Sequence, residues 1–394
     1  MFVSHYGIKD GGDANGFSRN INLFSELVKF GYEIEFLTTQ KTGFKFPYTK
    51  EIRSGVTIIA FPEFFPLRFR KGGISPLSTF IKMCYTLFNK ADIVYSDTGH
   101  RPNSGWPCYV NRFFHKSLYF SDWWEHYSKG GIYDDLPIPN KLTMGQFDNL
   151  FEIKNRTLAD GCIVISRTLK KRAIVNRISE SNILLLNTGS DVTNIPFFKI
   201  NSQKEKFGIS KDTFVIGIVG INREEINNNK YLVEGVKYLN DLGKKTILLT
   251  TGNIGNEVIE NSIIADKWVH FEWIPYEKFS VVISCADNFA LMQIDNLRNR
   301  SRFPNKFGDY LSAGRPIISN LIGDLKYYAN EFPECFYVVE NEKAFDVLLK
   351  AHEEWKNKSV NYEGIRKFAE NNSWNNRASL LNDFIKKIKL NKSA

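Results

Sequence analysis

Residues 302–318 have the sequence RFPNKFGDYLSAGRPII. Pro304 and Asn305 suit the start of a short helix, because proline has a fixed φ and asparagine has a capping side chain. Gly314 suits its end, since glycine readily takes the left-handed conformation just past a helix. The apolar residues that follow predict a buried strand. The stretch therefore predicts a helix followed by a strand of an α/β domain.

Polar groups gather at the start of this predicted helix. Asn305 and Lys306 lie in its first turn, and Asp309 lies one turn further on. Backbone N–H groups at a helix start favour an anion, and a carboxylate accepts hydrogen bonds from ribose hydroxyls, so the pattern fits a nucleotide. It fits equally well a surface helix of any α/β domain, with Lys306 and Asp309 simply solvated. The spacing alone leaves both interpretations open.

The same stretch resembles the nucleotide-sugar motif of the GT-B glycosyltransferases of family 4. Their motif has proline, then lysine, then an acidic residue followed by tyrosine, leucine and a short turn before an apolar strand. The matching residues here are Pro304, Lys306 and the run DYLSAGRP at 309–316. The resemblance implies that Asp309 accepts hydrogen bonds from the donor ribose. Two departures from the family are the shortening of its glutamate to Asp309 and the presence of Ser301 where the paired motif has its first glutamate, eight positions earlier.

The bulk composition fits a soluble globular protein with room for two domains. The chain has 394 residues, of which 43% are hydrophobic. No run approaches the roughly 18 apolar residues of a membrane span, and the chain does not begin with a signal pattern, so we expect a cytoplasmic protein. The net charge of +9 suits nucleic acid, anionic lipid or phosphorylated substrates and cannot choose among them. No metal-like cysteine pair and no D-x-D acidic pair at a strand end are present, so we expect no metal.

A glycine-rich loop follows the first predicted strand, residues 2–4, and precedes an amphipathic helix. Such a loop lets backbone N–H groups approach an anion. Gly11, Gly12 and Gly16 do not fit the G-x-G-x-x-G spacing of dinucleotide folds. Family 4 members have a similar loop between the donor diphosphate and the acceptor, so the resemblance implies that Gly12 and Asn15 bind the donor. A plain turn between strand and helix is the alternative.

Residues 118–131, LYFSDWWEHYSKGG, predict a strand that ends in acidic, aromatic and histidine side chains. Ligands of open parallel sheets lie beyond the carboxyl ends of strands, so this cluster is placed for function. Asp122 and His126 could hold sugar hydroxyls, and Trp123 or Trp124 could stack on a sugar. The alternative is that the tryptophans fill the core and His126 is hydrogen-bonded nearby. In some family 4 enzymes a histidine of this region lies near the donor sugar.

Two cations and an aromatic segment mark the second half. A predicted strand ends just before Arg223, and Lys230 follows where a helix begins. Family 4 enzymes have an arginine and a lysine here that hold the donor diphosphate, and fixed cations stabilise the charge of a departing nucleoside diphosphate. Solvated surface cations are the alternative. Trp273 and Ile274 lie in a segment that matches the one whose backbone meets the nucleobase in the family.

One segment mixes aromatic and basic residues. Residues 64–73, FFPLRFRKGG, could rest on a membrane surface, where acyl chains and anionic headgroups meet. A mobile loop that packs two or three phenylalanines is the alternative.

The resemblance extends over nearly the whole chain and implies the GT-B fold, an α/β architecture of two Rossmann-like doubly wound domains that face a central cleft. We expect residues 1–195 to form the acceptor domain, residues 205–372 to form the nucleotide-sugar domain, and a helix at residues 373–394 to cross back onto the first. Membership implies a retaining transfer from a UDP- or GDP-linked sugar to a glycan or lipid-linked acceptor, in surface polysaccharide or glycoconjugate synthesis. Beyond this co-substrate we expect no cofactor and no nucleic-acid partner. We expect a cytoplasmic location, and the segment at residues 64–73 leaves contact with the inner face of the membrane open as one alternative.

The implied catalytic residues divide into two groups. Lys230 and Lys306, with Arg223, stabilise the leaving group, whereas Asp122 and His126 would be candidate general bases if the transfer inverted. Two other functions fit the same architecture. A sugar-nucleotide epimerase shares it, and a catalytically silent binding protein would account for Ser301 and for an arginine displaced from the family position.

Overall fold

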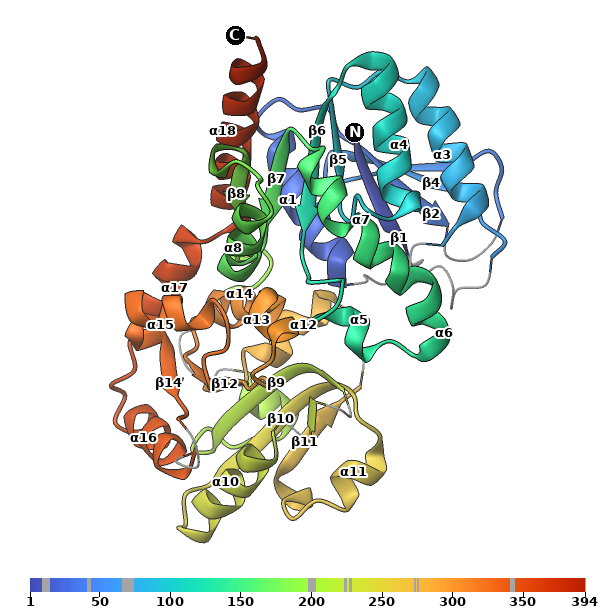
Figure 1. Cartoon of the computed structure of the whole chain (residues 1–394). Coiled ribbons are helices and arrows are strands. Elements are labelled where there is room, and N and C mark those ends of the chain that lie inside the picture. The colour runs from blue at the N-terminus through green and yellow to red at the C-terminus, as the bar shows by residue number, and fades with distance from the viewer. Residues whose placement is uncertain are drawn as a thin grey trace. The chain divides into compact units, whose positions relative to one another are not determined.

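We analysed a computed structural model of the chain. It describes residues 1–8, 15–40, 44–65, 74–197, 203–222, 225–226, 229–272, 274, 276–340 and 344–393. Within these, only the backbone is described for residues 5–8, 15–18, 276–278, 344 and 393. The chain divides into two compact units (Figure 1). Unit 1 comprises Met1–Gly189, Asn296–Phe303 and Trp374–Ala394, and unit 2 comprises Ser190–Asp295 and Pro304–Ser373.

Unit 1 is built on a sheet that has eight strands within the described residues, in the order β3-β4-β2-β1-β5-β6-β7-β8. Of these described strands, β3 alone runs antiparallel, against β4. The strands are β1 (Phe2–Ile8), β2 (Glu35–Gln40), β3 (Thr49–Arg53), β4 (Val56–Phe61), β5 (Ile93–Ser96), β6 (Leu118–Trp123), β7 (Gly161–Val164) and β8 (Ile183–Leu185).

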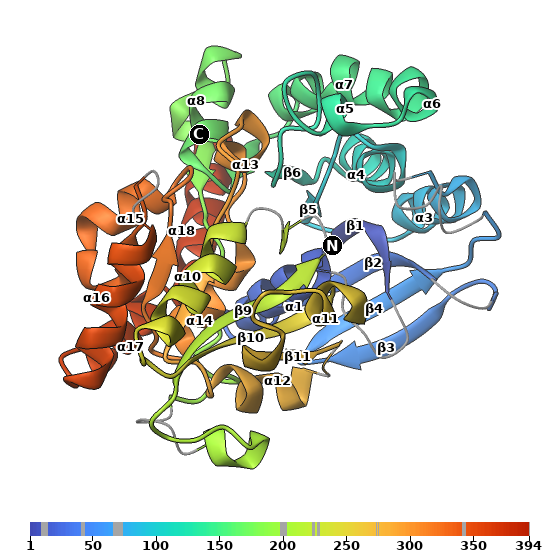
Figure 2. The same ribbon diagram turned by 90° about the horizontal axis from the view of Figure 1, so that it is seen from below.

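Helices cover both faces of this sheet. Figures 1 and 2 show α3 and α4 side by side on one face, and α1 packs against α18 on the other. The α-helices of unit 1 are α1 (Asn15–Val28), α3 (Pro76–Phe88), α4 (Pro102–His115), α5 (Ile132–Asp135), α6 (Ile138–Asn140), α7 (Gln146–Thr157), α8 (Arg167–Val175), α13 (Leu297–Ser301) and α18 (Trp374–Ser393). A π-helical turn, Lys141–Gly145, precedes α7, and a 3-10 turn, Glu180–Asn182, precedes β8.

Alternation along β1 explains the two layers of core. Phe2 belongs to the same apolar cluster as Phe24 of α1 and Leu381 of α18. Val3, the next residue, belongs to a second cluster with Cys108 of α4. Successive side chains of a strand point to opposite faces, so one strand supplies both cores. The expected return of the C-terminal helix onto the first domain is confirmed, because α18 is part of unit 1.

Unit 2 has a parallel sheet, which within the described residues has six strands in the order β11-β10-β9-β12-β13-β14. The strands are β9 (Phe214–Asn222), β10 (Thr246–Asn253), β11 (Trp268–Phe271), β12 (Asn288–Leu291), β13 (Ile317–Ser319) and β14 (Phe336–Val338). The α-helices are α10 (Lys230–Asp241), α11 (Asn256–Glu260), α12 (Tyr276–Ile283), α14 (Asn305–Ser312), α15 (Leu325–Glu331), α16 (Ala344–Lys356) and α17 (Tyr362–Asn371). Short 3-10 turns lie at Lys204–Phe207, Ala265–Lys267 and Pro333–Cys335.

The helix predicted from residues 302–318 is α14. Its end is as expected: Gly314 has φ +70°, its N–H donates to Leu311 O at 2.9 Å, and the N–H of Arg315 donates to Tyr310 O at 3.2 Å. Its start differs by one position, because Pro304 is the N-cap and no side chain caps the helix. Asn305 is therefore the first helical residue and not the cap.

The segment just before α14 belongs to the other unit. Helix α13 lies in the portion of unit 1 that spans Asn296–Phe303. Ser301 is buried there, and its Oγ donates to Leu297 O at 2.7 Å while its carbonyl accepts from Ser166 Oγ at 2.7 Å. The residue at the place of the motif's first glutamate thus holds α13 against unit 1.

Candidate functional site

In unit 2, a buried tyrosine fixes α14 against the sheet. The ring of Tyr310 stacks on Phe289 of β12, with centroids 4.0 Å apart and planes 1° apart. Its hydroxyl accepts a hydrogen bond of 3.0 Å from the backbone N–H of Val219 in β9. Because α14 starts at Asn305, its first turn is held beside the carboxyl end of β9.

Lys306 lies over the end of β9. Gly220 has φ +58°, and a Cβ at that position would lie 3.8 Å from Lys306 Cε. Positive φ favours glycine, so the turn of the strand here demands that residue. The Lys306 side chain is 26% exposed, and its Nζ lies 3.3 Å from Glu225 Oε2. A lysine charge therefore stands, partly shielded, at the edge of the sheet where ligands of parallel sheets bind.

Asp309 lies one turn after Lys306 and is partly buried. Among the described residues, its carboxyl group has no hydrogen-bond or ion-pair partner. Burial and the nearby negative charge of Asp191 raise the pKa of Asp309 to about 8. Asn194 Nδ2 donates hydrogen bonds to both carboxylate oxygens of Asp191, at 3.2 Å to Oδ1 and 3.0 Å to Oδ2. No local pattern in the sequence indicated Asp191, because its approach to Asp309 depends on the fold.

Lys230, the second predicted cation, is the first residue of α10. Its side chain is 76% exposed, and Nζ lies 3.8 Å from Glu234 Oε1. Asn229, just before it, donates Nδ2 to the backbone oxygen of Glu225 at 2.7 Å. The short segment that holds Glu225 near Lys306 is thus also linked to the start of α10.

The other predicted donor-site residues are described to different extents. Asn305 and Ile274 are both partly buried, and Asn15, the first residue of α1, is described by its backbone alone. The predictions for Gly12, Arg223 and Trp273 lie outside the described residues.

In unit 1, Asp122 is fully buried at the end of β6. Its Oδ2 accepts a hydrogen bond of 2.9 Å from the Tyr95 hydroxyl and lies 3.6 Å from Arg19 Nη2. Its Oδ1 accepts from the backbone N–H of Trp123 at 3.0 Å. Burial raises the pKa of Asp122, although the Arg19 charge opposes this effect. The structure thus places the predicted acid in an internal ion pair of unit 1.

His126 lies in the loop after β6 and is 2% exposed. Its Nδ1 is 3.4 Å from Arg172 Nη1, and its Nε2 has no hydrogen-bond partner among the described residues. Burial and the charge of Arg172 lower the pKa of His126. The imidazole is therefore neutral near pH 7, with one nitrogen still able to bond to a ligand.

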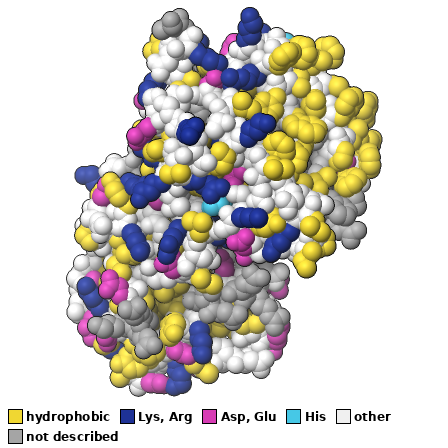
Figure 3. Space-filling view, in the orientation of Figure 1, with side chains coloured by type: hydrophobic (Ala, Val, Ile, Leu, Met, Phe, Trp, Pro, Cys, Tyr) yellow, Lys and Arg dark blue, Asp and Glu magenta, His cyan; other side chains and the backbone are white. Residues whose placement is uncertain are grey.

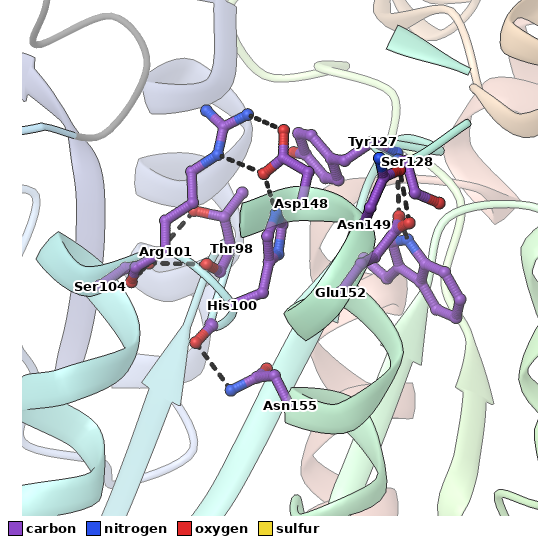
Figure 4. A network of polar contacts seen from close by, with 12 residues as sticks. Thr98, His100, Arg101, Ser104, Tyr127, Ser128, Asp148, Asn149, Glu152 and Asn155 are labelled. Atoms are coloured by element: carbon purple, nitrogen blue, oxygen red, sulfur yellow. Dashed lines mark hydrogen bonds and ion pairs between the residues drawn. The ribbon is translucent and has the colours of Figure 1, made fainter. Parts of the chain in front are cut away.

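A single carboxylate clamps this loop (Figure 4). Glu152 of α7 accepts hydrogen bonds from the backbone N–H groups of Tyr127 at 2.8 Å and Ser128 at 3.0 Å, and from Trp123 Nε1 at 2.9 Å. Arg172 Nη2 lies 3.3 Å from Glu152 Oε2. Trp123 is fully buried, which agrees with the alternative that the tryptophans of this segment fill the core.

A second buried carboxylate on α7 holds the segment that enters α4. Asp148 accepts from His100 Nε2 at 2.9 Å and pairs with Arg101, whose Nη2 lies 3.1 Å away (Figure 4). Burial lowers the pKa of His100 to about 4, so the ring is neutral, and its Nδ1 accepts from Arg156 at 3.2 Å. This network was not among the predictions from the sequence. Asp148, Glu152 and Asn155 follow one helical face, which was the available signal.

None of the helices in the described part of the chain has both the length and the apolar character needed to cross a bilayer. Within the same residues, no three histidine, cysteine, aspartate or glutamate side chains gather as metal ligands would.

Two α/β units, one with a largely parallel sheet and one with a parallel sheet, and a C-terminal helix that belongs to the first unit define the GT-B fold, and the predicted fold is confirmed. The chain is similar over 100% of its length to 98% of sucrose-phosphate synthase from Thermosynechococcus elongatus, with 14% identity and a TM-score of 0.72. Similarity to HepE of Anabaena in complex with UDP-glucose covers 98% of this chain and 99% of that one, with 10% identity and a TM-score of 0.64. WaaG, a glycosyltransferase involved in lipopolysaccharide biosynthesis, matches with 13% identity, coverage of 98% and 99%, and a TM-score of 0.65. No protein-family model and no curated protein sequence matches the chain.

The raised pKa of Asp309 predicts a pH-dependent cost of leaving this carboxyl group without a partner. The unfolded pKa is about 4, so the folded chain binds the proton more tightly and loses stability as pH rises toward 8. We expect Asp309→Asn to match the wild type near pH 4 and to exceed its free energy of unfolding by about 1–2 kcal/mol at pH 9, measured by urea denaturation. Asp346→Asn, which changes an exposed aspartate of unit 2, is the control. If the difference in free energy of unfolding between Asp309→Asn and the wild type does not increase with pH, the raised pKa of Asp309 is wrong.

The clamp at Glu152 predicts a large loss of stability on neutralisation. Glu152→Gln removes the carboxylate charge that balances the buried Arg156 and the partly exposed Arg172, so we expect the free energy of unfolding to fall by about 3–5 kcal/mol. Glu180→Gln removes an exposed partner of Lys170 in the same unit and should leave the free energy of unfolding nearly unchanged, because water screens exposed ion pairs. Urea denaturation of the wild type and of the two variants measures both effects. Equal losses of the free energy of unfolding in the two variants would show that Glu152 does not stabilise the loop after β6.

Proposed function

We propose that the chain is a glycosyltransferase that moves a sugar from a nucleoside diphosphate sugar to a glycan or lipid-linked acceptor. The observation that carries the proposal is the pair of Lys306 and Asp309, three positions apart on α14 at the end of β9. The lysine supplies positive charge for a diphosphate, and the carboxyl group, which has no partner among the described residues, can accept from ribose hydroxyls.

The structural neighbours support a nucleotide sugar as donor. HepE was crystallised with UDP-glucose, and WaaG takes part in lipopolysaccharide synthesis. We infer a UDP- or GDP-linked donor and a role in surface polysaccharide or glycoconjugate synthesis. We assign the acceptor to residues 1–195, the donor to residues 205–372, and the closing helix to residues 373–394. The unit boundaries at Ser190 and Trp374 support this division.

In the proposed mechanism, the chain stabilises the leaving nucleoside diphosphate with fixed cations. Lys306 and Lys230, with Arg223, offset the negative charge that develops as the sugar departs with retention of configuration. Asp309 positions the ribose. His126 offers an unbonded Nε2 to a sugar hydroxyl, whereas Asp122 acts through its buried bonds to Arg19 and Tyr95 by positioning the end of β6.

We further propose that unit 1 meets the membrane that carries the acceptor. Large apolar side chains gather on the surface where α3 and α4 lie (Figure 3). The most exposed are Phe88 at 81%, Phe113 at 79% and Phe80 at 64%. Lys116, which follows α4, is also exposed and suits anionic headgroups. Most of the aromatic and basic segment at residues 64–73 lies outside the described residues, so α3 and α4 carry this proposal.

Donor binding tests the central proposal. A panel of UDP- and GDP-sugars should contain one that raises the unfolding temperature, because a ligand bound only to the folded chain stabilises it. We expect Lys306→Ala to lower the affinity for that ligand by roughly 10- to 100-fold, because it removes a charge-assisted hydrogen bond of that strength. We also expect it to abolish sugar transfer. Calorimetry measures the affinity.

The matched control is Lys237→Ala, which removes an exposed lysine of α10 paired with Asp241. It should leave donor affinity within about twofold, since exposed ion pairs contribute little. The proposed function fails if no member of the panel stabilises the chain, or if Lys306→Ala binds the donor as tightly as the wild type.

The membrane proposal predicts loss of vesicle binding in a double variant of α4. Phe113→Ser with Phe114→Ser removes two exposed rings, each worth roughly 1.5–3 kcal/mol when buried in an apolar phase. We expect co-sedimentation with anionic vesicles to fall at least tenfold. Val175→Ser alters a residue of α8 that is 80% exposed and should leave binding unchanged. Full binding by the double variant would exclude this face.

A further inference from the structure

Unit 2 holds a cavity at the edge of its sheet opposite to the proposed donor site. This amino-edge cavity has a volume of about 640 Å³. Three of its lining residues come just before strands: Lys245 before β10, Asp287 before β12 and Arg315 before β13. In a parallel sheet these positions lie at the amino ends of the strands, whereas Gly220 and Lys306 mark the carboxyl end. The cavity is therefore separate from the proposed donor site.

Lysines line the rim of the amino-edge cavity. Lys244 lies 3.7 Å from Glu353, and Lys245 lies 3.0 Å from Asp212. The side chains of Lys356 and Lys358 are exposed, and neither makes a hydrogen bond or ion pair with any described residue. Two positive charges are thus available to an anion.

Lys358 lies two residues past the end of α16 and has φ +57°. Its N–H donates to Trp355 O at 3.1 Å, and that of Ser359 donates to Glu354 O at 3.0 Å. Glycine is the usual residue in this left-handed position, because a Cβ is strained there. The dipole of α16 accounts for Lys356 at its last turn. Lysine at position 358 instead adds charge at the cavity rim despite the strain.

A buried imidazole lines the cavity. His352 is 3% exposed, and its Nδ1 has no hydrogen-bond partner among the described residues. Its ring packs against Trp355 with centroids 5.4 Å apart. Burial, with the charges of Lys244 and Lys356, lowers the pKa of His352 to about 4, so the ring is neutral at pH 7. Buried polar atoms are nearly always bonded, so this nitrogen points to a missing partner.

Asp287, a carboxylate that lines the cavity, is already paired and does not repel an anion. Asp287 is paired with Lys204 Nζ at 2.6 Å and accepts from the backbone N–H of Val215 at 2.8 Å. The guanidinium of Arg315 lies 4.9 Å from the ring of Tyr362. The negative charge at the bottom is therefore balanced, and an aromatic ring stands beside it.

We propose that the amino-edge cavity binds a phosphorylated small molecule that carries a ring. Its phosphate lies against Lys356 and Lys358, and its ring lies against Trp355 and Tyr362. His352 Nδ1 bonds to one of its polar groups. Phosphate suits two ammonium groups of this kind, and aromatic walls suit an aromatic ring or a sugar face.

Calorimetry on the full chain tests the proposal with two probes, inorganic phosphate and phenyl phosphate. We expect phenyl phosphate to bind saturably and at least fivefold more tightly than phosphate, because only it has a ring. The double variant Lys356→Gln with Lys358→Gly should lower the affinity for phenyl phosphate at least tenfold. The glycine suits the left-handed backbone, so this double variant keeps its fold.

Three further variants separate this site from general charge effects and from the donor site. Lys350→Gln changes a lysine of α16 that is 68% exposed and outside the cavity lining, and it should alter affinity less than twofold. Lys306→Ala should leave phenyl phosphate binding intact. His352→Phe keeps a packed ring but removes Nδ1, and should weaken binding severalfold. The proposal is overturned if neither probe binds saturably, if Lys350→Gln weakens binding as much as the double variant, or if Lys306→Ala abolishes it.

Discussion

The stacking of Tyr310 on Phe289 is the contact on which the proposed donor site depends. The two rings lie flat against each other inside unit 2, and the tyrosine hydroxyl accepts from Val219 of β9. This one side chain therefore ties α14 to two strands at once. It holds α14 beside the end of β9, where the Lys306 side chain lies next to Gly220. The position of charge in the site thus follows from the packing of an aromatic core.

The carboxyl groups of the two units illustrate opposite solutions to burial. Glu152 receives hydrogen bonds from two backbone N–H groups and an indole, and the positive charge of Arg156 keeps its pKa below the usual value despite burial. Asp309 receives none from the described residues and faces Asp191, so its pKa rises. The first arrangement stabilises a loop. The second is unfavourable in the free chain and makes sense where a ligand supplies the missing donors, since functional sites commonly sacrifice stability.

Local patterns in the sequence predicted more of the fold than of the candidate site. Helix and strand at residues 302–318 followed from glycine, proline and apolar spacing, which act over a few residues. The approach of Asp191 to Asp309 joins positions that the chain separates widely, and no local pattern encodes it. Glu152 has the appearance of an ordinary helix-surface acid until the loop after β6 is placed against it. The assignment of α13 to unit 1 also depends on contacts remote in sequence.

The pairing of Lys306 with Glu225 bears on how a diphosphate would enter. The two groups lie 3.3 Å apart, and Glu225 is 41% exposed, so water screens their attraction. Separating such a pair costs about 1 kcal/mol or less, whereas a lysine-to-phosphate hydrogen bond returns about 1.5–3 kcal/mol. The exchange of carboxylate for phosphate is therefore favourable. Until a ligand arrives, Glu225 keeps the lysine side chain ordered over Gly220, which reduces the conformational entropy that binding must still remove.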